Sequence, residues 1–213
     1  MIDGPRIAPR QRATSLVVLL HGYGADGNDL IGLAEAWRDL LPATAFVAPH
    51  APQPLPFEAM GGRQWFDLTM RDPTELRRGT LAAAPALTRF LDAELARHAL
   101  APDRLALVGF SQGTMMALHV GLRRSVAPAA IVGYSGVIAG AEHLRAEIAC
   151  HPPVQLVHGE LDELIPVGAL AITREALAAA GVPVEWHIAP GLGHGIDPEG
   201  LALGGGFLAE HLE

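Results

Sequence analysis

Short apolar runs alternate with longer helical patterns along this chain. The runs are near-continuous in Leu, Val and Ile, which is typical of strands whose two faces are both buried. The runs lie at about residues 15–20, 44–48, 104–109, 129–134, 154–158 and 183–189, and the helical patterns at about 28–41, 74–98, 112–123, 166–180 and 198–211. The alternation predicts an α/β protein with a mostly parallel central sheet and helices on both faces.

Length and composition predict one folded unit. The 213 residues are 50% hydrophobic and 18% charged, which is enough for a large core, and no repeat or low-complexity linker divides them. We therefore expect a single domain over residues 1–213 without a separate lid domain. Residues 1–14 are expected to form a short tail or an edge strand, and we interpret Arg6, Arg10 and Arg12 there as part of a solvated tail.

The charge pattern excludes several kinds of partner. The formal net charge is -8 and no basic stripe is present, so we expect neither nucleic acid nor an anionic membrane surface as a partner. No apolar run approaches the roughly 18 residues of a membrane span, so stable membrane insertion is not expected. The first twelve residues lack the apolar core of a signal peptide, and the single cysteine, Cys150, cannot form an internal disulfide. These features predict a cytoplasmic protein.

A serine stands at a predicted sharp turn between a strand and a helix. The pentapeptide Gly109-Phe110-Ser111-Gln112-Gly113 follows the apolar run that ends at residue 108 and opens the next helical pattern. A side chain at either glycine position would collide with neighbouring backbone at such a bend. The pattern therefore predicts that Ser111 is an exposed nucleophile at the carboxyl edge of the sheet.

A serine nucleophile needs a histidine base and an acid, and both follow in the chain order Ser, Asp, His. Asp162 follows the run at 154–158, and His194 lies in a glycine-rich loop after the run at 183–189. Glu160 and Glu163 share the loop of Asp162 and are its competitors as the acid. His21 and His158 also lie at the ends of predicted strands near this edge, and we interpret both as structural hydrogen-bond partners.

Acyl transfer also needs backbone N–H donors for the negative charge of its intermediate. The amide of Gln112, directly after the serine, is one expected donor of this oxyanion hole. The second should come from the loop after the first strand, where the glycines of His21-Gly22-Tyr23-Gly24 allow close backbone approach, so we nominate the Tyr23 amide.

Five separated motifs resemble one known family. These are Leu20 to Gly27, Trp65-Phe66-Asp67, Gly109 to Gly113, His158 to Asp162, and Gly193-His194-Gly195. Together, from about Leu16 to the end of the chain, they resemble the phospholipase/carboxylesterase family of α/β-hydrolases, which includes the acyl-protein thioesterases. The resemblance implies a lidless ester or thioester hydrolase, with Ser111, Asp162 and His194 as the triad.

Two positions depart from the family pattern. Glu160 stands where the family usually has aspartate, two residues before the triad acid, and Tyr23 replaces a commoner leucine. The first departure leaves the acid itself in place. The second alters the expected pocket wall and bears on substrate preference.

The proline-rich segment 49–57 and the residues after it are expected to wall the pocket. The expected substrate contacts are Leu55, Trp65, Phe66, Ile165 and Leu192, although Trp65 could equally be a core residue. A homodimer is expected from the family resemblance alone.

No spacing typical of a metal site occurs among the ten histidines, so we expect no metal. Gly22, Gly24 and Gly27 imitate a nucleotide-binding glycine loop, but the serine turn, acid and base fit only a hydrolase, so no cofactor is expected.

The sequence thus predicts a serine carboxylesterase that hydrolyses small-molecule esters, or acyl thioesters, through an acyl-enzyme. The alternatives within enzymes are an acyl-protein thioesterase or lysophospholipase, a lactone or dienelactone hydrolase, and a peptidase. An alternative of another class is a non-catalytic binding protein on a hydrolase scaffold.

Overall fold

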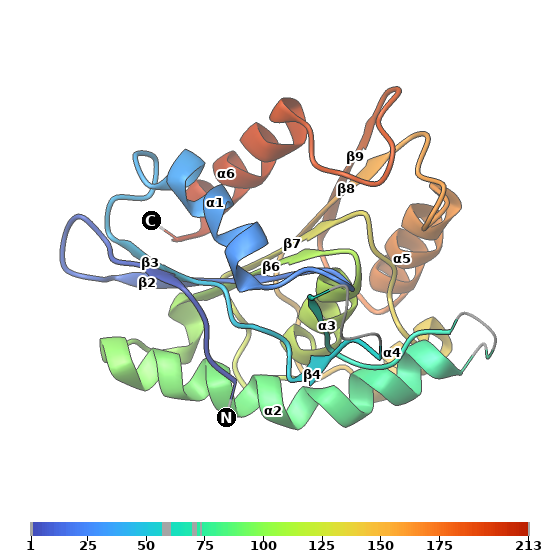
Figure 1. The fold of residues 1–213 in the computed structure, drawn as a ribbon, viewed down its shortest axis with the longest axis horizontal. Coiled ribbons are helices and arrows are strands. Elements are labelled where there is room, and N and C mark those ends of the chain that lie inside the picture. Colours follow the sequence, from blue (N-terminus) through green and yellow to red (C-terminus); the bar gives the residue numbers. More distant parts are fainter. Residues whose placement is uncertain (1, 57–60, 70–71, 73, 213) are drawn as a thin grey trace.

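The computed structural model describes residues 2–56, 61–69, 72 and 74–212, and its centre is a seven-stranded sheet (Figure 1). The strand order is β1-β3-β2-β6-β7-β8-β9, and every neighbouring pair is parallel except β1 with β3. The strands of this sheet are β1 (Arg6–Ile7), β2 (Ser15–Leu20), β3 (Thr44–Val47), β6 (Leu105–Phe110), β7 (Ala130–Tyr134), β8 (Val154–Gly159) and β9 (Val184–Ala189). The predicted mostly parallel sheet is confirmed.

Helices cover both faces of the sheet (Figure 1). One layer contains α1 and α6, and the other contains α2, α3 and α5. The helices are α1 (Gly27–Trp37), α2 (Glu75–His98), α3 (Gln112–Gly121), α4 (Leu144–Glu147), α5 (Gly168–Ala179) and α6 (Pro198–Leu212). The described residues form no separate lid domain.

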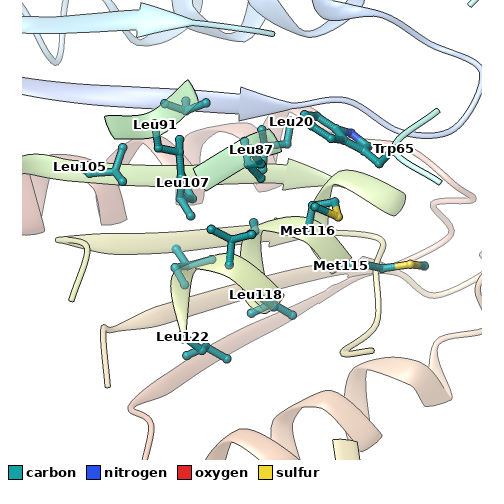
Figure 2. Packing of buried hydrophobic residues seen from close by; sticks show 14 of the residues in the cluster. Leu20, Trp65, Leu87, Leu91, Leu105, Leu107, Met115, Met116, Leu118 and Leu122 are labelled. Carbon is teal, nitrogen blue, oxygen red and sulfur yellow. The ribbon is translucent and has the colours of Figure 1, made fainter. Parts of the chain in front are cut away.

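Strand β2 shows why the apolar runs of the sequence are nearly continuous. All six of its residues are buried. Leu16, Val18 and Leu20 pack into the core layer beneath α2 and α3, whereas Val17 and Leu19 pack into the layer beneath α1 and α6. Figure 2 shows the first of these layers. A strand with helices on both sides buries both of its faces, so alternation with polar residues is lost.

Four elements differ from the prediction. Helix α1 ends at Trp37 and not near residue 41, because the approach to Pro42 disfavours further helical turns. The segment expected to be one long loop contains a short hairpin of β4 (Gln53–Pro54) and β5 (Arg63–Gln64). Helix α4 was not predicted, since four residues are too few to show a helical period.

The amino-terminal segment is tied to the sheet. Strand β1 pairs antiparallel with β3 at the edge of the sheet. The guanidinium of Arg6 donates to both carboxylate oxygens of Glu94 on α2, at 3.0 and 2.7 Å, and the Glu94 side chain is almost fully buried. The prediction that Arg6 belongs to a solvated tail was therefore wrong, because this arginine is the partner of a buried carboxylate.

The parallel strands carry their following loops to one edge of the sheet. The loops after β2, β6, β8 and β9 contain Tyr23, Ser111, Asp162 and His194, respectively. Residues that are far apart in the sequence are thereby brought to the same edge. None of the described helices is both long and apolar enough to cross a membrane.

Candidate active site

Ser111 occupies the sharp turn between β6 and α3. Its φ of 55° and ψ of -116° lie outside the usual regions for a residue with a side chain. The Ser111 N–H donates to the carbonyl of Tyr134 on the neighbouring strand at 2.9 Å. This bond and the start of α3 hold the strained turn in place.

The two flanking glycines have the steric role that the sequence suggested. A Cβ at Gly109 would lie closer than 3.0 Å to Thr114 N and to the Gly113 carbonyl group. A Cβ at Gly113 would overlap the Leu20 carbonyl group and lie 2.8 Å from the carbonyl oxygen of His21. The first turn of α3 thus packs directly on the backbone at the end of β2, which only glycine permits.

Asp162 and His194 form a close pair. The Asp162 side chain is fully buried, and its Oδ2 lies 2.7 Å from Nδ1 of His194. The other oxygen, Oδ1, accepts hydrogen bonds from the N–H groups of Leu164 at 3.0 Å and Ile165 at 2.9 Å. Burial alone raises the pKa of Asp162, but the hydrogen bonds from Ile165, His194 and Leu164 outweigh burial, and its pKa is lowered below 3.8.

The ionised carboxylate determines the tautomer of His194. A carboxylate oxygen can only accept, so Nδ1 of His194 carries the hydrogen of this bond. In the neutral imidazole, Nε2 then has a lone pair available to accept a proton. The ring of His194 also lies against Phe110, with the two centroids 4.9 Å apart, so the residue before Ser111 contacts the histidine loop.

The competing acids have other partners. Glu160 accepts from the N–H of Gly191 at 2.9 Å, which anchors the start of the histidine loop, and Asp197 accepts from Gly200 N–H at 2.8 Å at the start of α6. Asp197 directly precedes α6 and thus caps the start of this helix. Asp162, rather than Glu160 or Glu163, is the acid that contacts His194.

His21 and His158 are buried hydrogen-bond partners, as predicted. Nδ1 of His21 lies 2.8 Å from the Gly22 carbonyl oxygen, and its Nε2 accepts from the N–H of Ala51 at 2.9 Å. Burial lowers the pKa of His21, so the ring is held neutral. Nε2 of His158 lies 2.8 Å from the Ile165 carbonyl oxygen.

An apolar cavity of about 460 Å³ opens at Ser111 and His194. Most of its wall is aliphatic, with an aromatic side chain from the loop after β2. The described residues that line it are Gly22, Tyr23, Ala25, Leu68, Leu76, Phe110, Ser111, Met115, Val137, Leu164, Ile165, Pro166, Ala169 and His194. A lining of this kind suits an apolar ligand with one polar group near Ser111.

Of the expected pocket residues, Ile165 lines this cavity, as does Tyr23. Trp65 is a core residue instead: it is fully buried, and its indole N–H donates to the carbonyl of His21 at 3.0 Å (Figure 2). Phe66 is also buried and packs against α2, where a Cβ at Gly79 would overlap its ring. The prediction of substrate contacts for these two aromatic residues was therefore wrong, because the core takes their side chains.

Leu55 and Leu192 are likewise not among the described lining residues. Leu55 is buried near Gly24, and Leu192 contributes its backbone carbonyl, which accepts from the N–H of Leu161 at 2.8 Å. Their substrate contacts therefore stay predictions. The aliphatic lining from α2, α3 and α5 was missed, because helical periodicity cannot distinguish a pocket wall from the core.

The two nominated backbone donors belong to segments that adjoin the serine. Gln112 is the first residue of α3, so its N–H has no acceptor within the helix. The loop with Tyr23 approaches closely, since a Cβ at Gly22 would lie 3.3 Å from the Ser111 Cβ.

The Gln112 side chain has a further role that the sequence did not show. It is fully buried, accepts from Trp65 N–H at 2.9 Å and donates to the Phe66 carbonyl at 2.8 Å. Gln112 thus joins the start of α3 to the segment at 65–66.

Among residues 2–56, 61–69, 72 and 74–212, no group of three or more His, Cys, Asp or Glu side chains is placed to hold a metal ion.

The sheet order, the strained serine turn and the carboxylate–imidazole pair define an α/β-hydrolase fold. The model of one family, described as phospholipase/carboxylesterase, matches residues 5–212. The chain belongs to this family, so the protein is an enzyme of the class that hydrolyses ester bonds.

Curated relatives and solved structures agree with this assignment. The chain is 30% identical to acyl-protein thioesterase 1 of Gibberella zeae, over 97% of each protein. It is 43% identical to esterase PE8, whose crystal structure superposes with a TM-score of 0.94 over 99% of both chains. Acyl-protein thioesterase 2 of Zea mays, at 24% identity over 98% of both chains, shares the fold with a TM-score of 0.76.

Proposed function

We propose that this protein is a serine carboxylesterase in which Ser111 is the nucleophile, His194 the general base and Asp162 the acid that orients it. The observation that carries this proposal is the 2.7 Å contact of Asp162 with His194 at an apolar cavity that Ser111 also lines. A buried, ionised Asp162 holds His194 in the tautomer whose Nε2 can accept a proton.

The reaction proceeds in two halves. In the first, Ser111 Oγ attacks the carbonyl carbon of the ester while its proton passes to His194 Nε2. The C–O bond to the alcohol then breaks, and His194 returns that proton to the leaving alkoxide. In the second half, water loses a proton to His194 and attacks the acyl-enzyme, and the proton goes back to Ser111 as the carboxylic acid leaves.

The backbone N–H groups of Tyr23 and Gln112 would stabilise the oxyanion that forms in both halves. An N–H at the first position of a helix is favourable for negative charge, because the helix dipole adds to the free donor. The close approach of Gly22 to Ser111 supports a matching donor from the opposite loop.

The cavity bears on the substrate. Its aliphatic wall favours an apolar acyl group of a small-molecule ester over a charged one. A thioester is the second candidate, since a relative at 30% identity is described as an acyl-protein thioesterase. The same serine chemistry cleaves either bond, with thiolate in place of alkoxide as the leaving group.

The test combines labelling with kinetics. A fluorophosphonate probe should label the wild-type protein but not Ser111→Ala, and Ser111→Ala should lower kcat by about a millionfold if the triad acts as a unit. Ser125→Ala is the matched control, because this serine is exposed on a distant loop and should retain labelling and rate. Retention of most activity by Ser111→Ala would refute the proposal that Ser111 is the nucleophile. A wild-type protein with neither labelling nor activity would favour a binding protein.

A chain-length series of p-nitrophenyl esters alongside acyl thioesters would then define the substrate. Cytoplasmic location, a single domain and a homodimer remain predictions. Cell fractionation tests the location, the cooperativity of unfolding tests the single domain, and sedimentation tests the homodimer.

A further inference from the structure

A second buried histidine contacts the acid of the proposed triad. His158 lies near the end of β8, four residues before Asp162, and its side chain is 1% exposed. Its Nε2 is 2.8 Å from the carbonyl oxygen of Ile165 and 3.4 Å from Oδ2 of Asp162. Oδ2 is the same oxygen that meets His194.

The acceptors around His158 identify its proton. The carbonyl oxygen of Ile165 and the carboxylate of Asp162 can only accept hydrogen bonds, so Nε2 must carry a hydrogen. That N–H donates to Ile165 and points its positive end toward Asp162. No proton leaves His158 in the proposed reaction.

His158 thereby connects the two sides of the turn that holds Asp162. Ile165 donates its N–H to Oδ1 of Asp162 and accepts, through its carbonyl, from His158. The turn that holds one carboxylate oxygen is therefore fixed by the same imidazole that lies beside the other. Two N–H groups hold Oδ1, and two imidazoles flank Oδ2.

We propose that His158 is a positioning residue that fixes the Asp162 carboxylate and its turn, so that Oδ2 is directed at His194. This inference rests on the proposed function of Ser111 and His194 and extends it. Among the described acids on the adjoining loops, Glu160 accepts from Gly191 and Asp197 from Gly200, and Glu163 is exposed.

Two variants of His158 test the role. His158→Phe keeps a ring of similar shape but removes the donor, whereas His158→Gln restores an N–H donor at a similar reach. We expect His158→Phe to lower kcat by about tenfold to a hundredfold, as loss of such supporting partners does elsewhere, with KM nearly unchanged. His158→Gln should recover most of that loss.

A pH profile separates positioning from a structural role. The acid limb of kcat/KM reports protonation of the base in the free enzyme. Without His158, the N–H dipole that lies beside Oδ2 is lost, so the carboxylate should attract the protonated ring of His194 more strongly and the limb should move to higher pH. His158→Gln should return the limb toward its wild-type position.

The matched control is His119→Phe, since His119 is a buried histidine of α3 away from the cavity-lining residues. It should leave kcat and the acid limb unchanged. If His158→Phe lowers only the melting temperature while kcat per folded molecule and the limb stay at wild-type values, the positioning role is refuted.

A spectroscopic measurement does not depend on turnover. The proton between His194 Nδ1 and Asp162 should give a resolved ¹H NMR signal in the wild type that shifts or broadens in His158→Phe. An unchanged signal overturns the proposal, even if the esterase activity were absent and the proposed function had failed. If the wild-type protein were inactive but its signal still shifted or broadened in His158→Phe, the positioning role would stand and only the esterase proposal would be refuted.

Discussion

Gly113→Ala should damage both the stability and the activity of this enzyme through one added methyl group. The new Cβ would overlap the carbonyl of Leu20 and lie 2.8 Å from the carbonyl oxygen of His21, although real Cβ atoms essentially never approach below 3.0 Å. Strand β2 cannot easily move away, because it is fully buried and paired on both sides, with β3 and β6. The strain must therefore fall on the turn at Ser111 or on the loop with Tyr23.

The expected magnitude follows from the kind of contact. Overpacking of a tight core costs about 1–3 kcal/mol, and rigid backbone neighbours place this variant at the upper end, about 3 kcal/mol. A displacement of about 1 Å between the serine and an oxyanion donor lowers kcat by roughly a hundredfold.

Chemical unfolding and steady-state kinetics on one purified variant test both effects. Gly206→Ala in α6 is the matched control, since a Cβ there meets nothing within 4 Å. That variant should gain about 0.4–1 kcal/mol and keep its rate. A Gly113→Ala protein with wild-type stability and kcat would refute the claim that α3 packs directly on the end of β2.

Two more predictions concern buried polar groups. Burial lowers the pKa of His119 from 6.5 to about 4. The unfolded chain therefore takes up this proton at higher pH than the folded protein, and stability is lost as the pH falls through this window. The loss is about 2 kcal/mol at pH 5, and urea unfolding at pH 7 and pH 5 should show it in the wild type but not in His119→Phe. An equal loss in both proteins would contradict this assignment. Gln112→Leu leaves the N–H of Trp65 and the carbonyl of Phe66 without partners, so the free energy of unfolding should fall by about 2–4 kcal/mol. A fall below about 1 kcal/mol would show that this side chain does not anchor the segment at 65–66.

Local sterics and chain order explain why so much of the site could be predicted. The turn at Ser111 is encoded by its two flanking glycines, and parallel strands bring the loops of Asp162 and His194 to the same edge. The strands and the longer helices were predictable because near-continuous apolar runs and helical periods are properties of neighbouring residues. The short hairpin β4–β5 and helix α4 were missed, since elements of two to four residues carry no period.

By itself, the sequence determined the α/β architecture, the serine turn and the edge of the sheet that carries Asp162 and His194, since each follows from local sterics or from strand direction. Only the tertiary structure decided which side chains face the cavity. The Trp65 side chain lies in the core, whereas Met115 and Leu164 line the cavity, because the packing of elements distant in sequence sets the direction of a side chain. The same packing placed His158 beside Asp162, a contact that depends on how the turn after β8 folds back on its strand.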